Sequence, residues 1–180
     1  DIGVTGVQTC ALPIFRSAKK ITLGQARAAA YQEASGDLVA VIDADDLWMP
    51  EKLSRQVPLF DDPSVGLATC NTIHFSQKKE KVYYKKPPPT GFVFPYLLRD
   101  YRISLETLVF RKATADSLTR AFDPEFSFIA DMDLAIRLSR VSHLAHFPAP
   151  LAKWRVHAKS ESWSSPETFL FERERWIKKM

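Results

Sequence analysis

Three carboxylates stand within four positions of the sequence: Asp43, Asp45 and Asp46. They directly follow an apolar, largely β-branched run at residues 38–42, which predicts one buried strand that delivers acid at its carboxyl end. In open α/β sheets, ligands bind beyond the carboxyl ends of the strands. Neighbouring carboxylates repel one another unless a cation lies among them, and Mg²⁺ and Mn²⁺ prefer carboxylate and phosphate oxygens. The stretch therefore predicts a metal and phosphate site, with a helix-capping turn as the alternative.

The composition suits one globular domain, because 46% of the 180 residues are hydrophobic and 26% are charged. The formal charge of +4 is spread over the chain, apart from lysines at 78–81 and 85–86 that read as solvated loop faces. No apolar run reaches the roughly 20 residues that span a bilayer. Cys10 and Cys70 make no disulfide framework or metal-ligand spacing. These features favour a cytoplasmic protein that does not bind nucleic acid.

The first seventeen residues do not share the pattern of the rest of the chain. Residues 1–17 have no usable periodicity, and the string from Val4 to Ile14 resembles a translated sequencing adapter. We therefore expect 1–17 to be a non-native leader and 18–180 to form the folded domain.

Hydrophobic periodicity from residue 18 onward predicts an α/β domain in which helices and strands are interspersed. Gly36 is placed to end the first helix, and Pro148 and Pro150 predict a turn between two short strands. The expected helices are 18–34, 50–60, 92–98, 113–118, 129–140 and 166–180, and the expected strands are 38–42, 65–75, 82–84, 107–110, 144–147 and 151–156.

Three separated segments resemble glycosyltransferase family 2, whose catalytic domain has the GT-A fold. They are a glycine, alanine-arginine and acid-turn stretch at 24–48, a second acidic motif at 122–124 and 130–138, and an arginine-x-histidine segment at 154–157 with Ser160 and Ser162. Two positions depart from the family pattern. Ala130 stands where an acidic residue is usual, and Ala28 stands where asparagine is usual.

The resemblance also implies that part of the fold is missing. The family normally begins with a strand, a helix and two further elements before the glycine segment, and that half holds much of the nucleotide-base pocket. We therefore expect a partial GT-A fold that lacks the first strands of its Rossmann-like half. We also expect the 180-residue chain to have little transferase activity of its own.

The activity implied by the resemblance is transfer of a sugar, with inversion, from a nucleotide-diphosphate donor to an acceptor hydroxyl. The acceptor would be a glycan, a lipid-linked molecule or another hydroxyl compound, and peripheral membrane association is compatible with it. A divalent cofactor, Mn²⁺ or Mg²⁺, would neutralise charge on the departing diphosphate. The implied metal ligands are Asp45 and His157, and the implied nucleotide-sugar contacts are Arg27, Asp43, Asp46 and Arg155.

The second acidic motif supplies the candidate general base. Inverting transfer needs one carboxylate to take the proton of the acceptor hydroxyl as it attacks the anomeric carbon. Asp131 is the first choice, and Asp133 ranks second because it points elsewhere on the helix and favours the positive helix end. Trp48 and Trp154 could stack on sugar rings or be buried aromatics.

Two other classes of function remain open from the sequence. A strand that ends in Asp-x-Asp also resembles the haloacid-dehalogenase phosphohydrolases, with Asp43 as nucleophile and Asp45 as acid/base. The next positions, Asp46 and Leu47, differ from the glycine and threonine favoured there. The third class is a non-catalytic sugar-binding module, in which the carboxylates would tolerate alanine.

Overall fold

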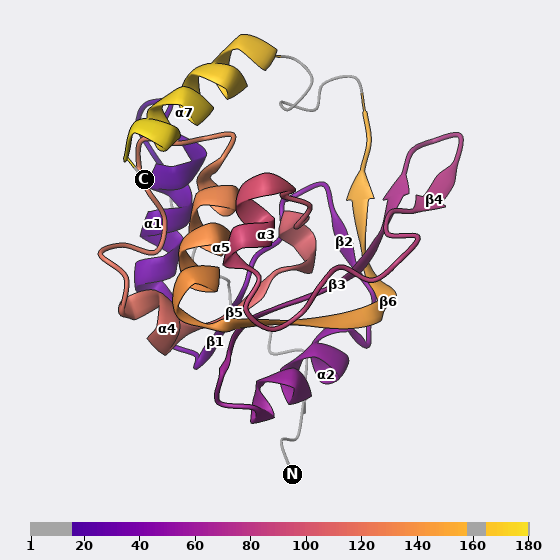
Figure 1. Ribbon diagram of the computed structural model, residues 1–180. Coiled ribbons are helices and arrows are strands. Elements are labelled where there is room, and N and C mark those ends of the chain that lie inside the picture. The colour runs from indigo at the N-terminus through magenta and orange to yellow at the C-terminus, as the bar shows by residue number, and fades with distance from the viewer. Residues whose placement is uncertain (1–15, 158–164, 180) are drawn as a thin grey trace.

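The computed structural model describes residues 16–157 and 165–179, and its centre is a six-stranded mixed sheet in the order β1-β5-β3-β6-β2, with β4 beside β3 (Figure 1). Of the described strand pairs, only β3 and β6 are parallel. The leader expected at 1–17 lies outside the described residues except for its last two positions, and Ser160 and Ser162 also lie outside them. The strands are β1 (Leu38–Ala40), β2 (Leu47–Trp48), β3 (Val65–Phe75), β4 (Glu80–Val82), β5 (Val109–Arg111) and β6 (His143–Arg155).

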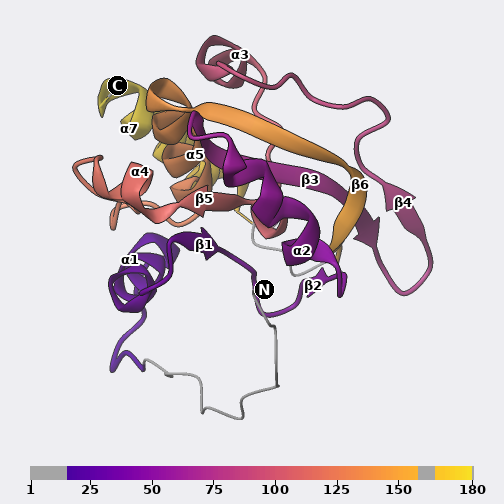
Figure 2. The same cartoon turned by 90° about the horizontal axis from the view of Figure 1, so that it is seen from below.

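Helices cover both faces of the long strands. Figures 1 and 2 show α3 (Phe94–Arg99), α5 (Ala130–Val141) and α7 (Pro166–Lys179) on one side of β3 and β6. The short α2 (Lys52–Gln56), followed by the 3₁₀ turn η1 (Val57–Asp61), lies on the other side. The other helices in the described part of the chain are α1 (Leu23–Glu33), η2 (Leu105–Thr107) and α4 (Lys112–Asp116). No helix in the described ranges is long and apolar enough to cross a bilayer.

The core is divided between the two faces of the sheet by strand alternation. Leu67 and Phe110 point into the larger cluster, which includes Leu134 of α5, whereas Ala68 and Val109 belong to a smaller cluster on the other face. Successive side chains of a strand point to opposite faces, so neighbouring residues of β3 and β5 separate in this way. The strand expected at 65–75 is confirmed at these bounds.

The segment before the acidic cluster is less buried than its composition predicts. Only residues 38–40 form β1, its residues are half-buried, and Ile42 is 40% exposed. Within the described ranges, β1 pairs only with β5, so one edge of the strand has no partner there. The prediction of a buried strand was therefore wrong, because burial depends on neighbours that local composition does not specify.

The acids that follow β1 do not cap a helix. They lead into β2, which pairs with β6, and α2 begins only at Lys52 with Glu51 at its N-cap position. The capping alternative is therefore wrong.

The proline segment of β6 also differs from the prediction. Residues 143–155 form one strand, and the register against β3 shifts where Asn71 pairs with Pro150. Proline has no N–H for the ladder and is tolerated at such bulges. The predicted turn between two strands is thus an irregularity within one strand.

The helix α1 begins later than predicted because a capping box fixes its first turn. The side chain of Thr22 accepts the N–H of Gln25 at 3.0 Å, and Gln25 Oε1 accepts the N–H of Thr22 at 3.1 Å. These two bonds satisfy N–H groups that have no partner within the helix. The other predicted helices and strands agree in type with the structure and differ by a few residues at their ends.

Gly24 lets α1 approach the loop that leads to α5. Its N–H donates to the carbonyl of Phe126 at 2.8 Å. A Cβ at this position would lie 2.1 Å from the carbonyl oxygen of Asp123 and 2.5 Å from that of Phe126. Because both obstacles are backbone atoms, a side chain here would push α1 away from the loop.

We expect Gly24→Ala to lower the free energy of unfolding by about 1–3 kcal/mol, the usual range for overpacking. Helix propensity alone would favour alanine by about 1 kcal/mol, so a loss shows that the close approach dominates. Urea denaturation measures the change. Ala30→Gly, at an exposed position of the same helix, is the control for propensity. A Gly24→Ala chain as stable as wild type would contradict the close approach.

Candidate active site

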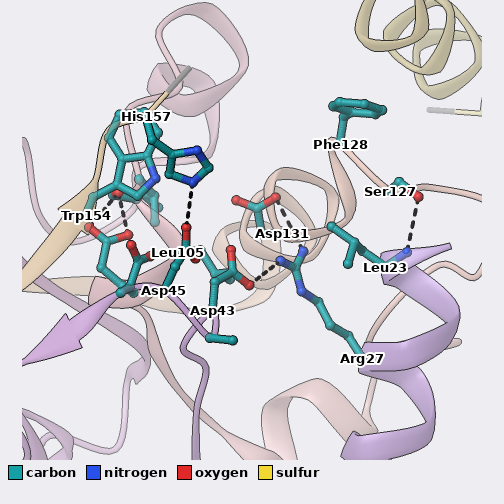
Figure 3. Close-up of a pocket in the computed structure, with 15 residues that line it drawn as sticks. Leu23, Arg27, Asp43, Asp45, Leu105, Ser127, Phe128, Asp131, Trp154 and His157 are labelled. Atoms are coloured by element: carbon teal, nitrogen blue, oxygen red, sulfur yellow. Dashed lines mark hydrogen bonds and ion pairs between the residues drawn. The ribbon is translucent and has the colours of Figure 1, made fainter. Parts of the chain in front are cut away.

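A cavity of about 470 Å³ lies beyond the carboxyl end of β1 (Figure 3). Its walls come from α1, the acidic turn after β1, η2, the loop before α5 and the end of β6. The site thus occupies the place that the acid-ended strand predicts. It is lined by Leu23, Arg27, Asp43, Ala44, Asp45, Asp46, Ile103, Ser104, Leu105, Glu106, Ser127, Phe128, Asp131, Trp154 and His157.

Arg27 joins the two acidic motifs across this cavity. One guanidinium nitrogen lies 3.0 Å from Asp43 Oδ1, and another lies 4.0 Å from Asp131 Oδ1 (Figure 3). Only 12% of the Arg27 side chain is exposed. Burial raises the pKa of Asp131 above its ordinary value, and the positive charge of Arg27 opposes part of that rise. Two carboxylates 88 positions apart in the chain therefore share one cation.

The two candidate bases on α5 have different surroundings. Asp131 lines the cavity, whereas Asp133 is buried on another side of the helix. Asp133 Oδ1 accepts the indole N–H of Trp176 at 3.0 Å, and its Oδ2 accepts from Arg137 Nε at 3.0 Å. Asp133 is thus engaged in packing α5 against α7. The role of Asp131 as the base, ranked above Asp133, stays a prediction.

The end of β6 brings Asp45 and His157 together. His157 Nε2 lies 2.9 Å from Asp45 Oδ2, and both side chains are partly exposed. Arg155 Nε donates to the backbone carbonyl of Asp45 at 2.8 Å, and its guanidinium lies 4.5 Å from the centre of the Phe75 ring. Arg155 therefore contacts the backbone of the acidic turn and does not line the cavity. Its nucleotide-sugar contact stays a prediction.

Asp46 is buried at the base of the turn. Its Oδ1 accepts the N–H of Arg155 at 2.8 Å, while its buried Oδ2 has no hydrogen-bond partner among the described residues. Burial raises the pKa of Asp46 to about 7, and the negative charges of Glu106, Asp43 and Asp45 add to the rise. The N–H of Arg155 opposes it. Near neutral pH, this side chain favours a proton or a nearby cation.

Glu106 is a cavity residue that sequence reasoning missed. It is 1% exposed, and its carboxylate accepts from the hydroxyls of Ser104 at 2.6 Å and Thr72 at 2.7 Å. Burial raises its pKa, although these hydroxyls favour the charged form. A single acid among the mostly apolar residues 105–110 was the available signal, because such a charge is seldom buried without a partner.

The two tryptophans differ in their relation to the cavity. Trp154 lines it and packs edge-on against His74, with ring centres 4.6 Å apart. Trp48 does not line it. Its indole N–H donates to the Glu106 carbonyl at 2.9 Å, and the Lys52 ammonium lies 4.6 Å from its ring centre. Of the two side chains considered for sugar stacking, only Trp154 is placed to contact a ligand.

Asp45, Asp46 and His157 are cavity residues with donor atoms for a divalent ion at the acidic turn. Within the described ranges, no group of three or more His, Cys, Asp or Glu side chains is arranged to hold a metal. Asp45 and His157 offer two adjacent donors, and Asp46, whose buried Oδ2 has no hydrogen-bond partner among the described residues, is also a residue of this cavity. Magnesium at nucleotide sites is commonly held by one or two carboxylates together with substrate phosphates. The residues fit an ion whose remaining ligands come from a diphosphate.

A family model described as Glycosyl transferase family 2 matches residues 11–118. The chain belongs to this family. The matched range contains Arg27 and the acidic turn, and it ends before Asp131 and His157. Membership favours the transferase prediction over the haloacid-dehalogenase alternative. No curated protein matched the chain.

Solved structures of S. aureus TarS share the fold of this glycosyltransferase family 2 chain. TarS 1-349 has a TM-score of 0.60 and 16% identity, over 82% of this chain and 42% of that one. TarS 1-349 in complex with UDP-GlcNAc has a TM-score of 0.62 and 18% identity, over 80% of this chain and 41% of that one. The chain thus spans about two-fifths of their length. The likeness confirms the partial GT-A fold.

We expect stability to depend on pH through Asp46. An acid whose pKa rises from 3.8 unfolded to about 7 folded is destabilising once ionised, so the free energy of unfolding falls as pH rises from about 4 to 7. Asp131 and Glu106 act in the same direction. Asp46→Asn keeps the acceptor for Arg155 and should recover about 2–4 kcal/mol at pH 8 but little at pH 4.

Urea denaturation at a series of pH values measures this difference. Asp61→Asn removes an exposed carboxylate outside the cavity and serves as the matched control. Equal pH profiles for wild type and Asp46→Asn would show that Asp46 does not carry the predicted linkage.

Proposed function

We propose that this chain transfers a sugar from a nucleotide-diphosphate donor to an acceptor hydroxyl, with inversion at the anomeric carbon. The observation that carries the proposal is the cavity in which Arg27 joins Asp43 of the acidic turn to Asp131 of α5. Inversion requires a leaving-group site and a base on opposite sides of the sugar. The two acidic motifs supply these two sides.

On the donor side, the acidic turn and Arg27 bind the nucleotide sugar. Arg27 is the one arginine or lysine among the residues that line the described cavity, and it orients Asp43 toward the ribose or the ion. Asp45 and His157 would hold a divalent ion, Mn²⁺ or Mg²⁺, which when bound neutralises charge on the diphosphate leaving group. Asp46 adds negative charge beneath the turn and favours cation binding there.

On the acceptor side, Asp131 is the general base. Its oxygens face the cavity, and burial raises its pKa, so the carboxylate is a stronger base than an exposed one. It takes the proton of the acceptor hydroxyl as that oxygen attacks the anomeric carbon. Arg27 keeps the carboxylate ionised before the transfer and stays paired with Asp43.

The donor we propose for the first experiments is UDP-GlcNAc. TarS, whose fold this chain shares, is described in complex with UDP-GlcNAc and with UDP. The acceptor we propose is a hydroxyl of a glycan or a lipid-linked molecule, reached from the cytoplasm and compatible with peripheral membrane association. The low activity expected of the 180-residue chain stays a prediction, and single-turnover assays with enzyme in excess allow it to be measured.

We expect Asp131→Asn to bind UDP-GlcNAc as wild type does and to lose sugar transfer by about two to four orders of magnitude, the usual contribution of a general base. Calorimetry measures binding, and single-turnover UDP release measures the reaction. Water serves as acceptor until a better one is known.

Asp133→Asn is the matched control for this loss. It removes a charge two residues away that is paired with Arg137 but keeps an oxygen that accepts the indole N–H of Trp176, so stability should fall while the reaction is retained. If Asp133→Asn loses the reaction and Asp131→Asn stays active, the base has been assigned to the wrong carboxylate. If wild type releases inorganic phosphate from a phosphate monoester and no UDP from UDP-GlcNAc, a phosphohydrolase is favoured. Donor binding without any reaction favours a binding module.

We expect Asp45→Asn to abolish the Mn²⁺-dependent part of UDP-GlcNAc binding. The substitution removes a negative ligand while leaving the backbone carbonyl that accepts from Arg155. Titration calorimetry with and without Mn²⁺ measures the effect, and Asp37→Asn, at an exposed position before β1, is the control. Mn²⁺-dependent binding that survives in Asp45→Asn would exclude this residue as a ligand.

A further inference from the structure

The C-terminal helix α7 places one buried carboxylate at the entry of α5. Glu172 Oε1 accepts the N–H of Ser127 at 2.9 Å, and Oε2 accepts the N–H groups of Phe128 at 2.9 Å and Ile129 at 3.3 Å. The N-cap residue of α5, Ile129, makes no side-chain capping bond. Glu172, 43 positions away from Ile129, thus satisfies N–H groups that an N-cap side chain would otherwise serve.

The residues held by Glu172 belong to the cavity. Ser127 and Phe128 line it, and Asp131 follows in the first turn of α5. Ser127 Oγ also accepts the N–H of Leu23 at 3.1 Å, at the start of the helix that carries Arg27 (Figure 3). The segment anchored by Glu172 therefore touches both helices whose side chains meet across the cavity.

A second contact of α7 acts on the same end of α5. Trp176 is buried, and its indole N–H donates to Asp133 Oδ1 at 3.0 Å. Glu172 and Trp176 lie four residues apart on α7, so they share one face of that helix. This face of α7 therefore contacts the chain on both sides of Asp131: Glu172 binds the amides of 127–129 before it, and Trp176 binds Asp133 after it.

We propose that Glu172 is a positioning residue of the transferase site, which fixes the entry of α5 so that Asp131 faces the acceptor. The inference rests on the function proposed above, because it assigns the consequence of this contact to the base. Glu172 does not line the cavity and is not a catalytic residue. Its carboxylate acts by accepting hydrogen bonds from backbone amides, so a substitution that removes this acceptor tests the role.

The test compares Glu172→Gln with Glu174→Gln in the 180-residue chain. Glutamine places an amide NH₂ against N–H donors that now meet a carboxylate oxygen, so at least one of them loses its acceptor. Glu174 is exposed on the same helix, and its substitution makes the same charge change. We expect hydrogen exchange at the amides of 127–129 to accelerate about tenfold or more in Glu172→Gln and to stay unchanged in the control.

The reaction supplies a second readout. Single-turnover release of UDP from UDP-GlcNAc should fall about 10- to 100-fold in Glu172→Gln. A loss of this size is expected when a general base is displaced from its position beside the attacking hydroxyl. Affinity for UDP-GlcNAc should change less than about twofold, because Arg27, Asp43 and Asp45 are untouched. Loss of folded protein would instead reduce the number of binding sites and the amplitude of the reaction together.

Titration of the Asp131 carboxyl by ¹³C NMR supplies a third readout. Its pKa should change in Glu172→Gln, because moving the first turn of α5 alters the distance from the Asp131 carboxylate to the Arg27 guanidinium, whose positive charge opposes the rise in that pKa. A purely structural role would lower stability without moving this titration. Glu172→Asp, with a shorter carboxylate, should give smaller effects in the same direction and replaces Glu172→Gln if that variant fails to fold.

The outcomes separate the two proposals. If Glu172→Gln matches Glu174→Gln in amide exchange and in the Asp131 titration, Glu172 does not position the site. If wild type neither binds nor turns over UDP-GlcNAc, the transferase proposal fails for this donor, and with it the catalytic consequence assigned to Glu172. Amide exchange then still shows whether the carboxylate holds the entry of α5.

Discussion

The site depends on one largely buried cation, Arg27, among five cavity-lining carboxylates. Like charges held close together are unfavourable unless a cation lies between them. Arg27 contacts Asp43 and Asp131, which come from opposite walls. Its own place depends on α1, which can reach the loop before α5 only because Gly24 has no Cβ. The backbone approach at Gly24 thus controls the electrostatics of the whole cavity.

Arg27 does not neutralise the cavity, and the remaining charge explains how the site can serve a ligand. Burial keeps the pKa values of Asp46, Glu106 and Asp131 above their ordinary values, so the fold holds three acids in surroundings that disfavour their charged forms. Such groups lower stability near neutral pH and are characteristic of functional sites. A cation bound with the donor diphosphate would relieve this repulsion, so ligand binding and fold stability should be linked.

Residues whose place in the site follows from their sequence neighbours could be predicted from the sequence. Residues whose place depends on partners far away in the chain could not. The acidic turn and Asp131 could be predicted from residue type, spacing and family resemblance, and β3 from its β-branched run. The exposure of β1 could not be predicted, because it depends on which strands pair with β1. Glu106 and Glu172 were missed for the same reason. Their partners, Thr72 and the amides at 127–129, are more than 30 positions away.

The loop at 122–128 shows why these distant contacts matter for the chemistry. On one side, its backbone carbonyls at Pro124 and Phe126 accept from Thr22 and Gly24 at the start of α1. On the other side, its last amides donate to Glu172 of α7. The distance between Arg27 and Asp131 therefore depends on hydrogen bonds that the main chain of a single loop makes on both of its sides. Side chains of this loop that point to solvent can vary without moving the site, whereas a change that displaces its backbone alters both walls of the cavity together.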